Sequence, residues 1–260
     1  MRRLSGGAQH PGMATLHTPL DAVSAVLRNP RLPAGHDERS VGFGVHGPPF
    51  ASGHCLALRH CPATSFGPGY RSVWHRDPAG VWTFYATTPA QLSCARYFSS
   101  VTTNDTVQCG IDIAWVTPWS LFVGIDGLLE WHIEIAATPR TRLMSNVAQR
   151  LPARAWTNRL ILGGLGRAAG AMLGAGQIRL SGTAPNGQRF IIAPTRLWAV
   201  AASRAVVCGE ELGPVGPLHH QDRLADFRTP QRGLFAVGCG HFETYDATHH
   251  RAADRATPIG

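Results

Sequence analysis

Short hydrophobic segments alternate with turn residues over most of this chain. Between Ser52 and Ala137, seven such segments are rich in β-branched and aromatic residues and are separated by Gly, Pro, Asn and Asp. They are Ser52–Cys61, Tyr70–Arg76, Val81–Thr87, Ser93–Phe98, Val107–Val116, Ser120–Asp126 and Leu129–Ala137. The short connections leave no room for crossover helices, so neighbouring strands are expected to be antiparallel. The pattern predicts a meander that curls into a barrel or sandwich.

Turn sequences predict two hairpins. In "SVWHRDPAGVWTFYAT", Asp77, Pro78 and Gly80 suit a type I turn, and His75 and Arg76 gather with Asp77 at its tip. These tip residues are either solvated or form one wall of a site. The second hairpin is predicted where "QIRLSGTA" and "QRFIIAPTRLWAVAA" flank an Asn-Gly turn, and the later segments "RAVVCG" and "GLFAVGCG" complete this second set of strands.

Helices are expected in two places. Residues 20–30 predict one short helix, and the stretch from Thr141 to Gly176 predicts two helices that are separated at Pro152. The second of these helices has an apolar stripe formed by Ile161, Leu165, Ala169 and Met172. It also has a glycine at every fourth position, at Gly166, Gly170 and Gly174. Each glycine weakens a solvated helix by about 1 kcal/mol relative to alanine, so close packing against the barrel is expected. A lid and a membrane-touching element are the alternatives, and arginines interrupt every apolar run too often for a transmembrane span.

The fold class expected from these elements is mainly β, an antiparallel lipocalin-like barrel or sandwich with an inserted helical pair. We expect a disordered start and short helix in residues 1–40, a single β-barrel-like domain in 41–245 with its helical insert at 140–176, and a disordered tail in 246–260. Met13 is an alternative start to Met1. The N-terminal arginines precede no apolar run, which favours a cytoplasmic protein, with peripheral contact at the inner face of the membrane as an alternative.

Composition excludes several kinds of chemistry. All 24 basic residues are arginine, so no lysine is available for a Schiff base, for pyridoxal phosphate or for a P-loop. The net charge is +8, but the arginines are scattered, and we expect no nucleic-acid partner. The six cysteines form no Cys-x-x-Cys pair and are expected to be reduced. The His219-His220 and His249-His250 pairs lack partners at ligand spacing, so neither a metal nor any other cofactor is expected.

Three residues are candidates for proton transfer. Asp112 and Asp126 have apolar neighbours, and a carboxyl group inside an apolar barrel has a raised pKa that suits a general acid. The alternative for both is a position at a strand end or turn. His75 shares a strand face with Asp77 and is the third candidate, because it would lie at a barrel mouth if that face looks inward.

Five further residues are candidates for ligand binding, namely Trp74, Arg96, Tyr97, Trp131 and His132. Arg96 and Tyr97 together suit a carbonyl or carboxylate group. The period of two places His132 between Glu130 and Glu134 on one strand face and Trp131 on the other. That acidic and imidazole face either lines a cavity or is the solvated outside of the strand.

A family resemblance adds to these expectations. The run from Pro49 to Phe242, with "FGPGYRSVWHRDPAGVWTFYAT", "SCARYF" and "LSGTAPNGQRFIIAPTRLWAV", resembles an uncharacterised group of actinobacterial proteins. More distantly it is similar to hydroxyneurosporene synthase (carotenoid hydratase) and to AttH-type proteins. The resemblance implies an antiparallel barrel with an apolar pocket and, in some members, acid-catalysed hydration or cyclisation of polyenes.

The function expected from the sequence is therefore a cofactor-free protein that binds an apolar small molecule, of isoprenoid or polyketide type, and hydrates, cyclises or isomerises it by proton transfer. Two alternatives remain open. One is a non-catalytic carrier with the same pocket, and the other is a structural protein that docks on a membrane or partner through its glycine-rich helix.

Overall fold

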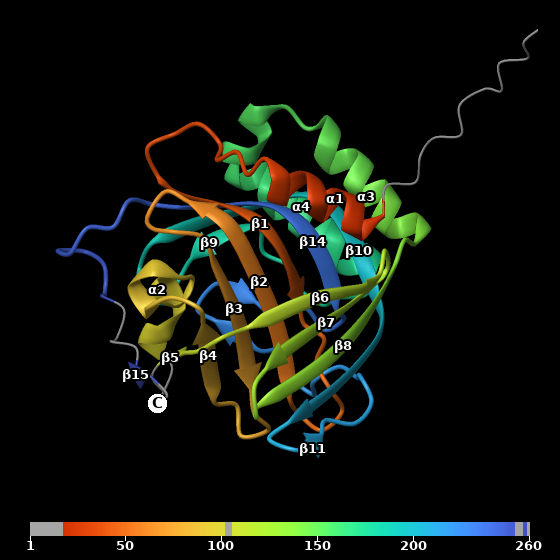
Figure 1. Ribbon diagram of the computed structural model, residues 1–260. Coiled ribbons are helices and arrows are strands. Elements are labelled where there is room, and N and C mark those ends of the chain that lie inside the picture. The colour runs from red at the N-terminus through yellow and green to blue at the C-terminus, as the bar shows by residue number, and fades with distance from the viewer. Residues whose placement is uncertain (1–17, 102–105, 253–256, 259–260) are drawn as a thin grey trace, which may run out of the picture.

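The computed structural model describes residues 18–101, 106–252 and 257–258 (Figure 1). The predicted disordered start falls mainly on residues 1–17, outside the described residues. The helices and 3-10 turns are α1 (Pro19–Arg28), η1 (Ala90–Leu92), α2 (Ala95–Phe98), η2 (Ser99–Val101), α3 (Pro139–Arg150), η3 (Ala153–Thr157) and α4 (Arg159–Leu173). The strands are β1 (Glu38–His46), β2 (Cys55–Thr64), β3 (Tyr70–Arg76), β4 (Trp82–Ala86), β5 (Val107–Gln108), β6 (Asp112–Thr117), β7 (Ser120–Ile125), β8 (Leu129–Ala136), β9 (Ser181–Thr183), β10 (Arg189–Val207), β11 (Glu210–Glu211), β12 (Arg223–Leu224), β13 (Phe227–Arg228), β14 (Leu234–Phe242) and β15 (Thr257–Pro258).

One large sheet dominates the fold. Its order is β15-β5-β4-β3-β2-β1-β14-β10-β8-β7-β6, with β9 and β11 pairing to β10. The pairings are antiparallel except where β5 lies parallel to β4 and to β15. The sheet curls so that β6, β7 and β8 cross over β1, β2 and β3, while α1, α3 and α4 gather at one end (Figure 1). The predicted fold class, mainly β with a curled antiparallel sheet and an inserted helical pair, is confirmed.

Bulges and glycines produce the curl. The register shifts between Val41 and Phe43 in β1, and again in β10 after Pro194. A bulge of this kind increases the local twist of the strand. At Gly42, a Cβ atom would collide with the carbonyl oxygen of His60 on the neighbouring strand. Glycine is therefore required where these strands approach closely.

The inside of the curl is filled with side chains. Phe43 and Val45 from β1, Phe235 from β14 and Trp131 from β8 belong to one buried cluster. The Trp131 Nε1–H donates a 2.8 Å hydrogen bond to Ser203 Oγ. An apolar pocket was expected inside the barrel, but packing occupies that space, and the two apolar cavities described below lie against the opposite face of the sheet.

The opposite face carries a second, aromatic cluster that includes Trp74, Tyr97, Phe98 and Phe227. The segment Ser93–Phe98 belongs here, and the prediction of a strand was wrong, because it forms a turn and the helix α2. Six residues are too few for alternation to distinguish a strand from a helical turn. In the helix, the Tyr97 ring stacks on Phe242 with 3.6 Å between ring centres.

The inserted helices follow the predicted plan. Pro152 separates α3 from η3 and α4, and the Asn158 side chain caps α4 by accepting hydrogen bonds from the Leu160 and Ile161 amides at 3.0 and 3.2 Å. The close packing expected at the glycines is present, but its partner is the chain that follows the helix. A Cβ at Gly166 would meet the carbonyl oxygen of Ile178, and at Gly170 that of Gly176. Within the described residues, no helix is long and apolar enough to cross a membrane.

Other segments differ from expectation in their extent. The strand β1 was not predicted, because glycines interrupt its hydrophobic pattern. Two predicted segments after Asn186 form one continuous strand, β10, of 19 residues. Residues 246–252, expected within a disordered tail, form a turn in which the His250 amide donates a 2.8 Å hydrogen bond to the Asp246 carbonyl.

Candidate functional site

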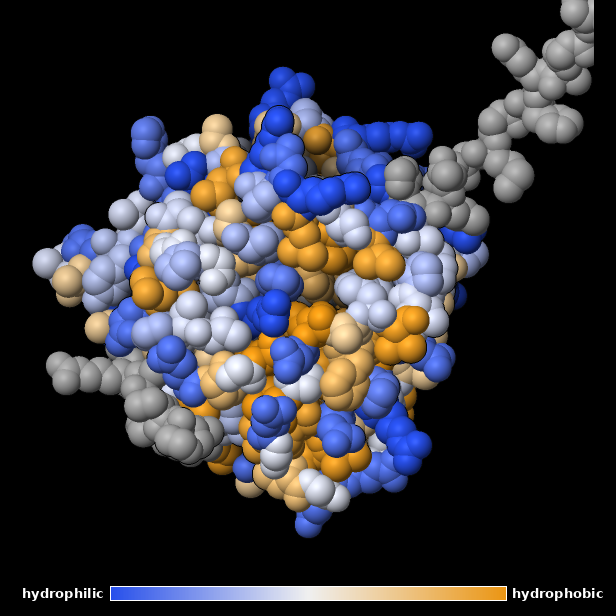
Figure 2. Space-filling view, viewed as in Figure 1, coloured by the Kyte–Doolittle hydropathy of each residue, from blue (hydrophilic) through white to orange (hydrophobic). Residues whose placement is uncertain are grey.

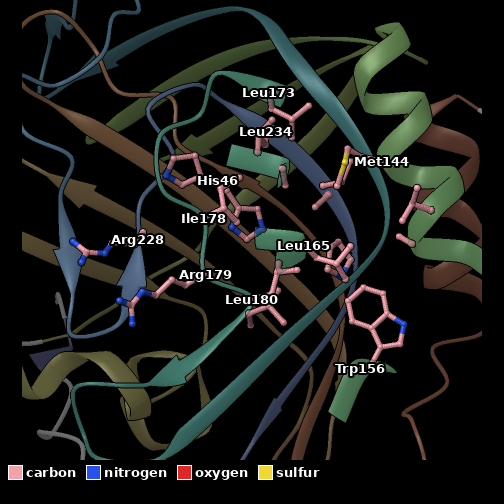
Figure 3. A pocket seen from close by; sticks show the side chains of 18 of the residues that line it. His46, Met144, Trp156, Leu165, Leu173, Ile178, Arg179, Leu180, Arg228 and Leu234 are labelled. Carbon is pink, nitrogen blue, oxygen red and sulfur yellow. The ribbon is translucent and has the colours of Figure 1, made fainter. Parts of the chain in front are cut away.

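A cavity of about 90 Å³ lies between the inserted helices and the sheet (Figure 3). We call it the helix-covered cavity. Most of its lining is aliphatic or aromatic, and the polar groups are His46, Trp156, Arg179 and Arg228. The full lining is His46, Met144, Val147, Ala148, Leu151, Trp156, Leu165, Ala169, Leu173, Ile178, Arg179, Leu180, Ile192, Pro194, Leu197, Phe227, Arg228, Pro230, Leu234 and Ala236.

Local sequence holds the helices over this cavity. The Ser145 hydroxyl of α3 accepts a 2.9 Å hydrogen bond from the Leu197 amide of β10. Gly174 ends α4 in the left-handed conformation, with φ of 61°, and turns the chain back along the helix. Because Gly166 has no side chain, the returning segment packs against α4 and places Ile178 in the cavity wall.

A second cavity of about 100 Å³ adjoins the first. The two share the lining residues His46, Ile192, Pro194, Phe227 and Ala236. The second cavity, which we call the glycine cavity, lies over Gly42, Gly44, Gly238 and Gly240, which alternate with core residues along β1 and β14. At Gly42, Gly44 and Gly238 the carbonyl oxygen of a neighbouring strand occupies the position of a Cβ, so only the backbone of this face lines the cavity there.

Arg59 of β2 lines the glycine cavity. Its Nη1 donates hydrogen bonds to the carbonyl oxygens of Leu58 and Val45 at 2.9 and 3.2 Å. Its guanidinium carbon lies 4.7 Å from the centre of the Trp74 ring and 5.9 Å from that of Phe227. Burial lowers the pKa of this arginine from its ordinary value. Among the residues that the structure describes, no carboxylate forms an ion pair with Arg59.

His46 lies where the two cavities meet, since it lines both. Burial lowers the pKa of its imidazole well below the ordinary value, and the charge of Arg59 lowers it further. The ring is therefore neutral at pH 7, with one nitrogen free to accept a proton or a hydrogen bond.

Tyr70, Cys61 and Cys239 of the glycine cavity are uncharged at neutral pH, because burial raises the pKa of each. Burial raises the pKa of Tyr70 well above its ordinary value and that of Cys61 to about 11. The Trp74 Nε1–H points at the sulfur of Cys94 at 3.2 Å. Neither cavity has an aspartate or a glutamate in its lining. The site can hold apolar groups and hydrogen-bonding or anionic groups, and within the described residues it offers no carboxyl group as an acid.

Asp112 and Asp126 line neither of these two cavities. Both are exposed, one at the start of β6 and the other in the turn after β7. Together with Glu130 they line a groove of about 350 Å³ that shares no residue with either cavity. The expectation that apolar neighbours bury them was wrong, because in a half-buried strand apolar and exposed positions alternate. Their catalytic role stays a prediction, without the burial that supported it.

The predicted ligand-binding residues are scattered. Trp74 lines the glycine cavity, whereas Trp131 belongs to the core inside the curl. His132 is exposed between Glu130 and Glu134, so this face is the solvated outside of β8. Arg96 and Tyr97 both bind Glu38 at 2.7 Å and line neither cavity. Arg96 and Tyr97 act together on a carboxylate, as predicted, but that carboxylate is Glu38 of the same chain and not a ligand.

The hairpin tip is tied into the protein. The nitrogens His75 Nε2 and His54 Nδ1 lie 2.9 Å apart, and the two rings are nearly parallel, at 7°. Arg76 forms an ion pair with Asp222. Asp77 accepts a 2.8 Å hydrogen bond from the Val81 amide and so stabilises its own turn. None of the three residues lines the helix-covered cavity or the glycine cavity, and His75 lines a separate, very small cavity with Leu56 and Tyr85.

Sequence reasoning missed Arg59, His46 and the glycines. A signal exists in "VGFGVHG" and "FAVGCG", where glycine alternates with large apolar residues. Such a pattern places all the large side chains on one face of a strand and leaves the other face bare.

No group of three or more metal-ligating side chains occurs among the residues described.

Comparisons with known proteins do not identify the chain. No family model and no curated protein matches it. Among solved structures, acetoacetate decarboxylase from Legionella pneumophila is similar at 9% identity and a TM-score of 0.38, over 94% of this chain and 99% of that one. A second acetoacetate decarboxylase is similar at 9% identity and a TM-score of 0.36, over 93% and 96%. At these values no activity is transferred, and the function must be argued from the site.

Proposed function

We propose that this protein binds an apolar small molecule in the helix-covered cavity, with one end of the molecule reaching the glycine cavity. One observation carries the proposal: the two adjoining linings are mainly aliphatic and aromatic and contain no carboxylate. A concave, mainly apolar surface with few polar groups is typical of a ligand site. The isoprenoid and polyketide classes expected from the sequence belong to the proposed ligand class.

A fluorescent probe tests this proposal. N-phenylnaphthylamine is neutral and apolar, and we expect its emission to rise on titration with the protein. Ala148 is half-buried on α3 and lines the cavity, so Ala148→Trp should fill the space and weaken binding at least tenfold. Ala168→Trp, on the exposed face of α4, is the matched control and should bind as the parent does. Absence of binding by the parent protein, or equal loss in both variants, would exclude this cavity as the site.

If the bound molecule is also transformed, His46 is the residue that we propose as proton acceptor. Its imidazole is neutral and lines both cavities. Among the described residues no protein group forms a hydrogen bond to it. The sequence-based candidates Asp112, Asp126 and His75 line neither cavity.

A second candidate function is docking at an anionic membrane surface. From Ile135 to Gly209 the chain has no acidic residue. The helical insert carries exposed arginines at 140, 142, 150, 154, 159 and 167, and its exposed apolar side chains include Leu143 at 51% and Leu160 at 86%. Strongly hydrophilic residues follow the upper edge of the molecule, where α3 lies (Figure 2). Basic and apolar side chains on one helical surface suit anionic lipid.

Vesicle sedimentation tests the docking. The protein should bind phosphatidylcholine vesicles that contain phosphatidylglycerol and should not bind phosphatidylcholine alone. Each arginine near the surface contributes about 1 kcal/mol, so Arg140→Gln with Arg150→Gln should abolish most of the binding. Arg223→Gln, an exposed arginine of β12, is the control. Equal binding to both kinds of vesicle, or none to either, would refute the docking.

A further inference from the structure

We infer that the ligand carries an anionic group, a carboxylate or one of similar size, which binds the guanidinium of Arg59. The inference rests on the proposed function, because it names the chemical class of the molecule in the same site. Arg59 is positively charged, and no described carboxylate serves as its counter-ion.

Two half-buried arginines of this protein have carboxylate partners. Arg76, with its side chain 18% exposed, is paired with Asp222, and Arg96, 17% exposed, is paired with Glu38. A buried charge without a counter-ion is costly, since desolvation is not offset by attraction. Arg59 has no such partner, and neither have Arg39, Arg71, Arg196 and Arg228 among the described residues, so the case for a ligand at Arg59 depends on its place in a cavity wall.

The contacts of Arg59 offset its charge only in part. Both of its hydrogen bonds leave from Nη1 and end on backbone carbonyl oxygens. The Trp74 and Phe227 rings add cation–π attraction. Within the described residues, Nε and Nη2 have no hydrogen-bond partner. These two nitrogens form the fork by which an arginine binds a carboxylate with two parallel hydrogen bonds.

Space for an anion lies beside this arginine. Arg59 lines the glycine cavity together with Gly42 and Gly44 of the neighbouring strand β1. The adjoining His46 is neutral and can donate a further hydrogen bond to an anion. No acidic side chain lines either cavity, so nothing there repels a negative group.

The helix-covered cavity would then receive the apolar part of the ligand. The two cavities share five lining residues, and His46 marks the boundary between them. A molecule with an apolar body and an anionic end matches this arrangement, with the body under α3 and α4 and the charge at Arg59. Medium-chain, isoprenoid and polyketide acids are members of this class.

Two matched pairs of probes test the inference. Anilinonaphthalene sulfonate and N-phenylnaphthylamine share an aromatic body and differ in charge, as decanoate and decanol share a chain. We expect the protein to bind each anion at least tenfold more tightly than its neutral partner, because hydrogen bonds to a charged group are the stronger ones. Decanoate should also raise the melting temperature more than decanol does.

Variants locate the effect. Arg59→Met keeps most of the side-chain volume and should remove the preference for the anion while leaving affinity for the neutral probe. Arg59→Lys keeps the charge and should retain part of the preference. Arg204→Met is the control, because Arg204 is exposed, is paired with Glu211 at 2.5 Å and lines neither cavity; it should leave the preference unchanged.

The outcomes separate the two proposals. Equal affinity for anion and neutral partner in the parent protein, or an undiminished preference in Arg59→Met, overturns the anionic ligand and leaves the apolar site standing. Absence of binding for all four probes overturns the proposed function and, with it, this inference. If Arg59→Met does not fold, the comparison within the parent protein and with Arg59→Lys decides.

Discussion

The guanidinium carbon of Arg59 lies 4.7 Å from the centre of the Trp74 ring, between two strands that pair in register. Trp74 is almost fully buried, at 1% exposed, and contacts the rings of Trp82, Phe84 and Phe98. The tryptophan therefore links the aromatic cluster to the wall of the glycine cavity.

This relationship predicts the effect of Trp74→Ala. Truncating a buried tryptophan costs about 3–5 kcal/mol, through lost burial and the cavity that remains. We expect that loss in the free energy of unfolding by urea, and a smaller one for Trp74→Phe. Trp119, half-buried at the β6–β7 turn, is the comparison, and Trp119→Ala should cost clearly less. Equal losses of unfolding free energy at the two positions would show that Trp74 contributes no more to stability than Trp119 does.

The packing of α4 predicts a contrast between glycines. At Gly170 a leucine side chain would collide with the Gly176 carbonyl, so Gly170→Leu should destabilise the protein by about 1–3 kcal/mol and weaken binding of the neutral probe. Nothing lies within 4 Å of a Cβ at Gly164. Gly164→Ala should therefore stabilise the protein by up to about 1 kcal/mol. Thermal melts of both variants measure this contrast, and the idea fails if the two shift in the same direction.

Stability should fall as the pH is lowered. Burial and His54 lower the pKa of His75 to about 4, against the opposing effect of Asp77. The unfolded chain binds a proton near the ordinary value of about 6.5, so protonation favours unfolding between these two values. The contribution of His75 is complete above pH 6.5 and is lost as the pH falls toward 4.

Urea unfolding at a series of pH values measures that slope. His75→Gln cannot titrate and should show a shallower decline in unfolding free energy between about pH 6.5 and 4. His219→Gln, at an exposed position, should decline as the parent does. Identical slopes for all three proteins would show that His75 is not the responsible group.

Asp112→Asn and Asp126→Asn should leave binding of the neutral probe unchanged. Both side chains are exposed and line a groove that is separate from the two cavities. Exposed substitutions of this kind usually change stability by no more than about 0.5 kcal/mol. Fluorescence titration and urea unfolding check both expectations. Weaker binding in either variant, with folding intact, would move the site to that groove.

Local sequence determined much of the secondary structure. The Leu129–Ala136 strand follows its period of two, with Trp131 buried and His132 exposed. The turn at Gly80 and the break at Pro152 lie where the sequence predicts them. These features depend on residues that are neighbours in the chain, so backbone geometry and side-chain alternation suffice to predict them.

Local reasoning failed where a distant segment decides the environment of a residue. Asp112 has apolar neighbours in the chain but lies at an exposed strand end. Arg76 looks like a solvated turn residue, yet it pairs with Asp222, 146 positions away. Arg96 and Tyr97 suit a carboxylate, and the one they bind is Glu38 of the same chain.

The sequence by itself determined many of the strands, the helical insert and the absence of lysine chemistry. Only the tertiary structure decided where the cavities lie, because their walls come from segments that are remote in the chain. Gly42 of β1 pairs with Gly238 of β14, and the bare face that they share appears only once the sheet has formed. In the same way, only the folded chain shows that Arg59 lacks a counter-ion, because among the described residues no acidic side chain forms an ion pair with it.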